Sequence, residues 1–191
     1  MSKLHFKYGA MNSGKSDTLI KTAYNYEERG LRVIVVKPAI DTKGNDHVTA
    51  RGGHRRKVDI LAEPTTDLFK EVADRENIAC VLVDEAQFLE PEQISQLFRV
   101  AKEQSISVIC YGLRADFRTE LFPGSKRLLE IADNIAKLPT MCFCGSQAEF
   151  NTRRIGDKYV FEGDQVAIDG EGVVEYDSLC GSCYAREGGV I

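Results

Sequence analysis

One N-terminal segment carries residues that could bind a chain of phosphates. Its spacing, Gly-x4-Gly-Lys-Ser, is that of a Walker A loop, in which the lysine reaches the β- and γ-phosphates and the serine ligates Mg²⁺. The glycines let the backbone curl until successive N–H groups point at phosphate oxygens. A glycine-rich turn that matches by chance is the alternative. The eight residues are Gly9, Ala10, Met11, Asn12, Ser13, Gly14, Lys15 and Ser16.

Two acids, Asp84 and Glu85, directly follow an apolar run that ends at Val83. In P-loop proteins an aspartate at a strand end organises the Mg²⁺ shell, directly or through water. We expect the next side chain, that of Glu85, to point away from Asp84 and to accept a proton from an attacking hydroxyl or water. A pair that only solubilises the strand end or caps a helix is the alternative. The two acids alone do not separate an ATPase from a kinase.

Four of the six cysteines lie in the last part of the chain, as a C-x-C pair, Cys142 and Cys144, and a C-x-x-C pair, Cys180 and Cys183. In a reducing compartment such pairs favour a metal over disulfides. Four thiolates suit tetrahedral Zn²⁺ and leave no ligand position for water, so the predicted site is structural. Two disulfides or a redox pair are the alternatives, because the C-x-C pair is one residue shorter than the usual knuckle.

The elements that must position these residues are short apolar runs that alternate with helix-like stretches. The runs are residues 4–8, 33–36, 78–83, 106–110 and 135–138, and the predicted helices are 15–29, 66–75, 91–103 and 124–132. Apolar strands separated by helices are typical of a parallel sheet covered on both faces. The sequence therefore predicts an α/β fold, a P-loop (RecA-like) parallel sheet flanked by helices. Residues 41–57 show no periodicity, and we expect a long connection that is functional or disordered.

The character of the chain changes near Pro139. Alternating patterns at 158–161, 165–168 and 173–176, many glycines and the clustered cysteines follow. They predict a small β-rich module built around a metal. We therefore divide the chain into a nucleotide-binding domain, 1–138, and a zinc-binding domain, 139–191.

The composition is that of an ordinary soluble chain of 191 residues, with 43% hydrophobic and 28% charged residues and a net charge of −4. An acidic balance argues against a large nucleic-acid footprint, although a basic patch remains around Arg51. No apolar run approaches a membrane span, and the N-terminus lacks a signal-peptide core. We expect a cytoplasmic protein with no membrane partner. Cys80 and Cys110 lie in apolar runs and are interpreted as core residues.

These motifs, in this order, resemble the type II thymidine kinase family. The matching segments are residues 8–16, 83–88 (Val-Asp-Glu-Ala-Gln-Phe), 111–118 (Tyr-Gly-Leu-Arg-Ala-Asp-Phe-Arg) and the cysteine module with Tyr176. The Walker A loop alone is unspecific, but the combination is specific and spans nearly the whole chain. The resemblance implies a kinase that uses ATP and Mg²⁺ to phosphorylate the 5′-hydroxyl of thymidine or deoxyuridine in nucleoside salvage. It also implies a homotetramer, feedback inhibition by dTTP and a structural Zn²⁺.

The resemblance further implies roles for single residues. Glu85 matches the general base, while Asp84 and Gln87 join the Walker A residues at the nucleotide. Phe117 matches an aromatic that packs on the thymine ring, and Tyr176 matches a tyrosine of a lasso that is tethered to the zinc module. A core aromatic and a residue packed on the metal knuckle are their respective alternatives. The implied nucleoside-binding residues are Met11, Leu113, Phe117, Gln165, Val166, Ala167, Ile168, Asp169 and Tyr176.

A zinc-ribbon P-loop ATPase that acts on nucleic acid is the alternative function, because a strand-end Asp-Glu pair also occurs in helicases. The chain offers little length for a second motor domain, and it is acidic without an aromatic-rich basic stripe. A non-catalytic nucleotide-sensing module would not need a base. We therefore expect a nucleoside kinase without a nucleic-acid partner.

Overall fold

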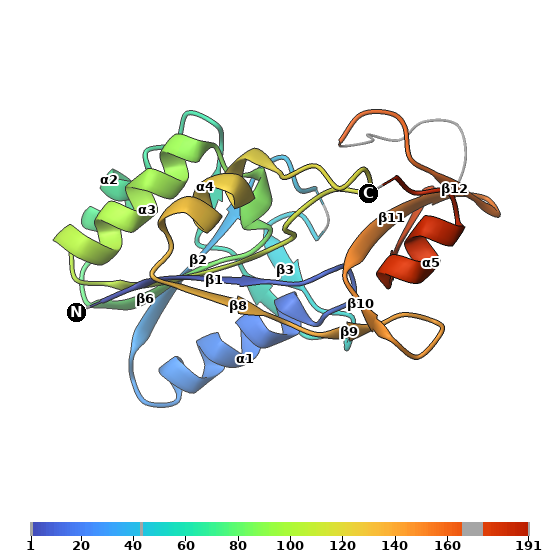
Figure 1. Ribbon diagram of the computed structural model, residues 1–191. Coiled ribbons are helices and arrows are strands. Elements are labelled where there is room, and N and C mark those ends of the chain that lie inside the picture. The colour runs from blue at the N-terminus through green and yellow to red at the C-terminus, as the bar shows by residue number, and fades with distance from the viewer. Residues whose placement is uncertain (1, 43, 166–173, 191) are drawn as a thin grey trace.

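A parallel sheet of six strands forms the centre of the protein in the computed structural model, which describes residues 2–42, 44–165 and 174–190 (Figure 1). Its strands are β1 (Leu4–Tyr8), β2 (Arg32–Pro38), β5 (Ile60–Ala62), β6 (Ile78–Val83), β7 (Ser107–Gly112) and β8 (Asn134–Lys137). Their order across the sheet is β5-β2-β6-β7-β1-β8, and every neighbouring pair is parallel. The carboxyl ends of all six strands therefore lie at one edge, which is where ligands of such sheets bind.

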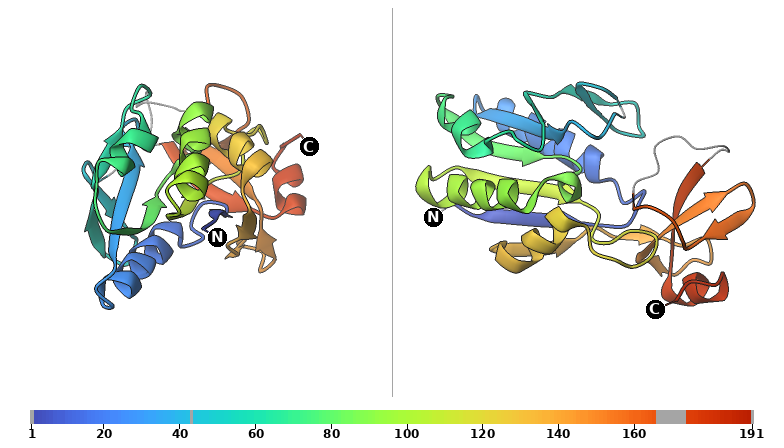
Figure 2. Two further views of the ribbon diagram at one scale, coloured as in Figure 1. Left: turned by 90° about the vertical axis from the view of Figure 1, so that its left-hand side faces the viewer. Right: turned by 90° about the horizontal axis from the view of Figure 1, so that it is seen from above.

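Helices cover both faces of this sheet, as Figures 1 and 2 show. One face carries α1 (Lys15–Glu27), and the other carries α2 (Leu68–Ala73), α3 (Pro91–Glu103) and α4 (Pro123–Ile131). Successive residues of a strand point to opposite faces, so the central strands must be apolar throughout. In β6, for example, Leu82 packs on the α1 side and Val83 on the α3 side.

The predicted α/β fold is confirmed, and the five predicted strands and four predicted helices end within two residues of the observed bounds. The strand β5 was not predicted. It has only three residues, of which Ile60 and Ala62 are buried and Leu61 is exposed. A segment this short is too brief to show a period.

The sequence left the conformation of the connection over residues 41–57 open, and the structure shows that this segment contains a hairpin. The strands β3 (His47–Thr49) and β4 (Arg55–Lys57) pair in antiparallel register. Val48 and Val58 pack beneath α1 and anchor the hairpin to the sheet. A single buried valine within β3 and another just after β4 give no visible alternation, so the polar residues of this segment show no period.

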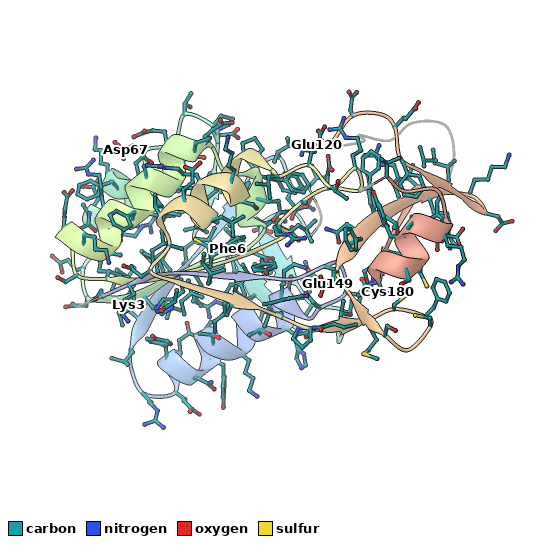
Figure 3. All side chains as sticks on the ribbon, in the orientation of Figure 1. Lys3, Phe6, Asp67, Glu120, Glu149 and Cys180 are labelled. Carbon is teal, nitrogen blue, oxygen red and sulfur yellow. The ribbon has the colours of Figure 1, made fainter. Side chains whose placement is uncertain are left out.

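The C-terminal part is a small β-rich module, as predicted. It contains the pair β9 (Thr140–Met141) and β10 (Gln147–Ala148), the sheet β12 (Lys158–Val160), β11 (Phe150–Ile155) and β13 (Val174–Leu179), and the short helix α5 (Gly181–Arg186). Its core stacks the ring of Phe150 on that of Tyr184, with centroids 4.9 Å apart. Figure 3 labels Phe6 inside the central sheet and Cys180 beside α5 in this module. Of the alternating pattern at 165–168, residues 166–168 lie outside the described residues.

None of the helices within the described ranges has the length and apolar character needed to cross a bilayer.

Candidate active site and metal centre

The phosphate-loop motif lies between the end of β1 and the start of α1, as its spacing predicts. Gly14 adopts φ +72°, a left-handed conformation that favours glycine, and it is the N-cap of α1. Because this residue has no side chain, the N-terminal amides of the helix are not covered by a capping group. A helix N-terminus in this state attracts anions.

Lys15 places its charge over the same loop. Its Nζ donates to the carbonyl oxygens of Ala10 and Gly9 at 3.0 and 3.3 Å and lies 3.4 Å from Ser13 Oγ. The ammonium group is therefore centred on the loop that would surround a phosphate chain.

Ser16 and Asp84 come together although 68 residues separate them. Ser16 Oγ donates to both carboxylate oxygens of Asp84, at 3.2 and 3.4 Å. A hydroxyl and a carboxylate are the hard oxygen ligands that Mg²⁺ prefers. The residues present thus fit the ion that the Walker A motif predicts.

Asp84 is almost fully buried, and this changes its ionisation. Burial raises the pKa of the Asp84 carboxyl to about 7, and the neighbouring charge of Glu85 acts in the same direction. The hydrogen bond from Ser16 opposes the shift but is the smaller effect. An ionised Asp84 therefore requires a compensating cation nearby.

Glu85 adopts φ +49°, which few residues other than glycine adopt, at the junction between β6 and the short helix η1 (Ala86–Phe88). Its Oε2 accepts a 2.5 Å hydrogen bond from Gln87 Nε2, and Gln87 Oε1 accepts the backbone N–H of Leu113 at 3.0 Å. Gln87 is buried, and both ends of its amide bind protein groups. It therefore fixes the Glu85 carboxylate relative to the loop after β7.

A cavity of about 310 Å³ collects most of the predicted residues. Glu85 and Leu113 line it together with residues of the phosphate loop. The predicted residues that line it are Met11, Asn12, Ser13, Gly14, Lys15, Ser16, Glu85 and Leu113. Asp84 is buried rather than part of this lining.

Four residues of the cavity lining were not predicted: Asp17, Thr49, Ala50 and Arg51. Three of them follow or end β3, so the hairpin forms one wall of the cavity. Arg51 brings a cation to this wall. The only sequence signal for it was the local basic patch between residues 51 and 57, because the hairpin itself has no readable period.

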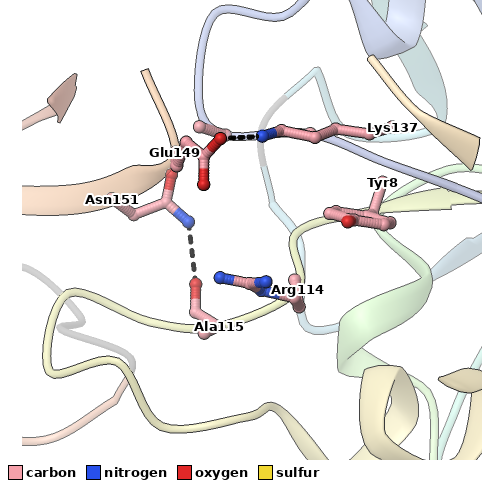
Figure 4. Close-up of a pocket in the computed structure, with 8 residues that line it drawn as sticks. Tyr8, Arg114, Ala115, Lys137, Glu149 and Asn151 are labelled. Carbon is pink, nitrogen blue, oxygen red and sulfur yellow. Dashed lines mark hydrogen bonds and ion pairs between the residues drawn. The ribbon is translucent and has the colours of Figure 1, made fainter. Parts of the chain in front are cut away.

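The remaining residues of the phosphate loop, Gly9 and Ala10, line a second cavity of about 10 Å³, just large enough for one water (Figure 4). Here the C-terminal module meets the phosphate loop. Asn151 Oδ1 accepts the backbone N–H of Met11 at 2.8 Å, and its Nδ2 donates to Ala115 O at 2.7 Å. No motif indicated Asn151, because its role depends on a contact between segments 140 residues apart.

The two aromatic residues predicted to contact a nucleoside, Phe117 and Tyr176, do not line the cavity of about 310 Å³. Phe117 is only 2% exposed, and its carbonyl oxygen accepts a 2.7 Å hydrogen bond from the Tyr184 hydroxyl. Arg153 lies over the Phe117 ring and also contacts Tyr176 and the backbone of Gln165. These three predicted residues are thus brought together around one unpredicted arginine. The other four lie outside the described residues: Val166, Ala167, Ile168 and Asp169.

The four C-terminal cysteines form one cluster, with their Sγ atoms all within 4.8 Å of one another. All six cysteines are free thiols, so the disulfide alternative is not observed. Zinc–sulfur bonds of about 2.3 Å place tetrahedral sulfurs roughly 3.8 Å apart, and Cys144 Sγ lies 3.6 Å from Cys180 Sγ. The amide N–H of Cys183 donates to Cys180 Sγ at 3.4 Å. The cluster could hold one metal ion.

The thiols of this cluster differ in acidity. Hydrogen bonds from Ser146 lower the pKa of Cys144 to about 6, whereas burial raises the pKa of Cys183 to about 12. Four thiolates cannot accumulate in so small a volume without a cation, because each charge opposes the next. A divalent ion provides the required compensation.

Comparisons with known proteins agree on one family. The family model described as "Thymidine kinase" matches residues 2–184. The chain is 43% identical to a thymidine kinase of Haemophilus influenzae, with 100% of both chains covered. It is 44% identical to a thymidine kinase of Chromobacterium violaceum, covering 98% of this chain and 100% of the relative. A thymidine kinase of Enterobacteria phage T4 is 43% identical over 94% of each chain.

The raised pKa of Asp84 predicts how the stability of the nucleotide-free protein depends on pH. The folded state binds the proton of the Asp84 carboxyl more tightly than the unfolded state does. Protonation of Asp84 therefore stabilises the fold, fully below the unfolded pKa of 3.8, and this stabilisation is lost as pH rises through about 7. In Mg²⁺-free buffer the wild-type Tm should fall between pH 5 and 8, whereas Asp84→Asn should flatten this decline. Thermal melts followed by circular dichroism measure both.

Asp157→Asn, in an exposed turn, is the control, and its melts should follow the wild-type profile. Parallel profiles for Asp84→Asn and the wild type would show that this carboxyl does not titrate as its burial implies.

Proposed function

Because the chain belongs to the thymidine kinase family, we propose that it transfers the γ-phosphoryl group of ATP to the 5′-hydroxyl of thymidine or deoxyuridine in nucleoside salvage. The observation that supports this most directly is the 310 Å³ cavity, which has a phosphate loop on one wall and a carboxylate on another. A phosphoryl-transfer site needs both, since catalysis depends on positioning and on charge stabilisation.

On the donor side, the loop amides and Lys15 hold the β- and γ-phosphates. Ser16 Oγ and Asp84 hold Mg²⁺, which neutralises charge on the phosphate oxygens when bound. Arg51 lines the same cavity and adds a second cation for the transferring group. Negative charge that develops during transfer is thereby stabilised from several sides.

On the acceptor side, Glu85 is the general base that takes the proton of the 5′-hydroxyl. Glu85 lines the cavity, and its carboxylate is oriented by the amide of Gln87. The same Gln87 holds the backbone of Leu113, which also lines the cavity. One buried side chain thus sets both the base and a wall of the acceptor site. In this proposal Gln87 acts through Glu85 and Leu113 rather than on the nucleotide itself.

The nucleoside occupies the region between this cavity and the C-terminal module. Met11 and Leu113 contact it from the cavity, and Phe117 and Tyr176 contact it from the module side. Backbone groups of residues 165–169 read the pyrimidine edge. The division of the chain into a nucleotide-binding domain, 1–138, and a zinc-binding lasso domain, 139–191, follows from these separate tasks.

Structural Zn²⁺, held by the four-cysteine cluster, is the second metal in this proposal. Four cysteine ligands fill its coordination shell, so its contribution is to folding of the module rather than to chemistry. A homotetramer, feedback inhibition by dTTP and a cytoplasmic location complete the proposal on the basis of the family resemblance.

The nucleic-acid ATPase alternative receives no support from the relatives described above. They are named thymidine kinases and match over 94–100% of their own lengths. A kinase is therefore favoured over a nucleic-acid motor.

Incubation with ATP, Mg²⁺ and each nucleoside in turn tests the activity. We expect the 5′-monophosphate of thymidine and of deoxyuridine, detected by chromatography, and little ATP turnover without a nucleoside. ATP hydrolysis that does not depend on a nucleoside and increases when DNA or RNA is added would contradict the kinase proposal.

Glu85→Gln tests the base. The amide keeps the size of the side chain but cannot accept the proton, so kcat should fall on the order of 10²–10⁴-fold. ATP affinity, measured by calorimetry, should stay close to wild type because the phosphate loop is untouched. Glu103→Gln, on the exposed surface of α3, is the control and should leave both values unchanged. An unaltered kcat for Glu85→Gln would show that a group other than Glu85 accepts the proton of the 5′-hydroxyl.

Removal of the metal tests the cysteine cluster. Elemental analysis should find one zinc per chain in the wild type and none in Cys183→Ser, whose Tm should fall because the module loses its cross-link. Ser182→Ala, exposed within the same C-x-x-C pair, is the control and should retain the zinc and the Tm. A zinc-free wild-type preparation with full activity and an unchanged Tm would contradict a structural zinc.

A further inference from the structure

Arg153, in the middle of β11, belongs to no sequence motif and has no role in the proposed reaction so far. It is 4% exposed, which is unusual for an arginine. The centre of its guanidinium group lies 3.9 Å from the centroid of the Phe117 ring and 5.5 Å from that of Tyr176. A cation over an aromatic face is attractive, and more so when water is excluded.

The edge of the same guanidinium group makes three hydrogen bonds. Nε donates to the Tyr176 hydroxyl at 3.2 Å, and Nη2 donates to the carbonyl oxygens of Asp164 and Gln165 at 2.7 and 3.4 Å. A planar guanidinium can offer one face to a ring while its N–H groups donate in the plane, which the point charge of a lysine cannot do. The arrangement is therefore specific to arginine.

This clustering carries an energetic constraint. A buried cation is costly unless polar and aromatic groups replace the water it has lost. In residues 2–42, 44–165 and 174–190 the groups that do so are oxygens of two backbone carbonyls and a phenol, together with two rings. Movement of any of these groups would leave the charge less compensated. Arg153 thus holds each of them in place.

We propose that Arg153 is the positioning residue of the nucleoside site. It fixes the Phe117 ring, the Tyr176 hydroxyl and the chain at 164–165 in one arrangement. The proposal rests on the proposed function, in which Phe117 and Tyr176 contact the nucleoside. Loss of Arg153 should weaken nucleoside binding far more than ATP binding, because the contacts described above join it to Phe117, Tyr176 and residues 164–165 and not to the phosphate loop.

A second contact from the same module supports this assignment. The Tyr184 hydroxyl donates to the carbonyl oxygen of Phe117, and Tyr184 directly follows the metal-cluster residue Cys183. Phe117 is thus fixed at its backbone by α5 and at its ring by β11. Its position depends on the C-terminal module rather than on its own loop alone.

Arg153→Met tests the proposal with Arg154→Met as the matched control. Arg154 is the next residue on β11, is partly exposed and pairs with Glu175. In steady-state kinetics, Arg153→Met should raise KM for thymidine roughly 10- to 100-fold, the range expected when hydrogen bonds to a charged group are lost. KM for ATP should change less than about threefold, because the variant weakens the binding of thymidine and leaves the ATP-binding residues unchanged. Arg154→Met should match the wild type in both constants.

Two further variants separate positioning from simple stability. Arg153→Lys keeps the charge without the planar donors and should retain most of the thymidine KM defect. Tyr176→Phe removes only the phenol oxygen, so as a single variant it should raise KM for thymidine. The double variant with Arg153→Met should have a KM for thymidine close to that of Arg153→Met alone. Arg153→Lys and the single variant Tyr176→Phe, each compared with the wild type, keep the test decisive even if Arg153→Met folds poorly.

Three results would overturn the proposal: equal kinetics for Arg153→Met and Arg154→Met, full rescue by lysine, or KM values for thymidine and ATP that rise together with a lowered Tm. The wild type is assayed first. If it does not phosphorylate thymidine, the proposed function fails, and that failure is read before any Arg153 variant is compared.

Discussion

The pairing of Ser16 with Asp84 is the interaction on which the site depends. The two residues follow β1 and β6, which are not neighbours, because β7 lies between them in the sheet. The phosphate loop must therefore cross the carboxyl end of β7, where the N–H of Gly9 donates to Gly112 O. This crossing brings the loop after β7 against the cavity. Glu85 and Leu113, which both line the cavity, then follow from chain continuity.

The sequence predicts the parts of the molecule that are encoded locally. Apolar runs predicted the buried strands. The Walker A spacing and the strand-end acids indicated residues that the structure brings together, such as Ser16 and Asp84, because each motif lies within a few consecutive residues. The three-residue strands β3, β4 and β5 could not be predicted, since a period needs more than one repeat. Because the hairpin was not predicted, the sequence placed Arg51 in a basic patch but did not place it at the cavity.

Contacts between distant segments set a different limit. The cysteine cluster was predictable because its members come in two close pairs, yet nothing in those pairs indicates that the Tyr184 hydroxyl donates to the carbonyl oxygen of Phe117. Asn151 and Arg153 act on loops far away in the sequence, through one side chain each. No sequence spacing identifies such residues, and their contacts are seen only in the folded structure. The module is thus tied by direct hydrogen bonds to the phosphate loop and to the loop that carries Phe117.

In its proposed role as general base, Glu85 illustrates a conflict between folding and turnover. Its backbone lies at φ +49°, where a residue with a Cβ atom costs on the order of 1 kcal/mol relative to glycine. Glycine or asparagine at this position would relax the backbone and remove the carboxylate at the same time. A library of variants sorted only for yield of folded protein would therefore enrich these residues at position 85, whereas growth on salvaged nucleoside would retain glutamate. The two selections act in opposite directions on a single residue.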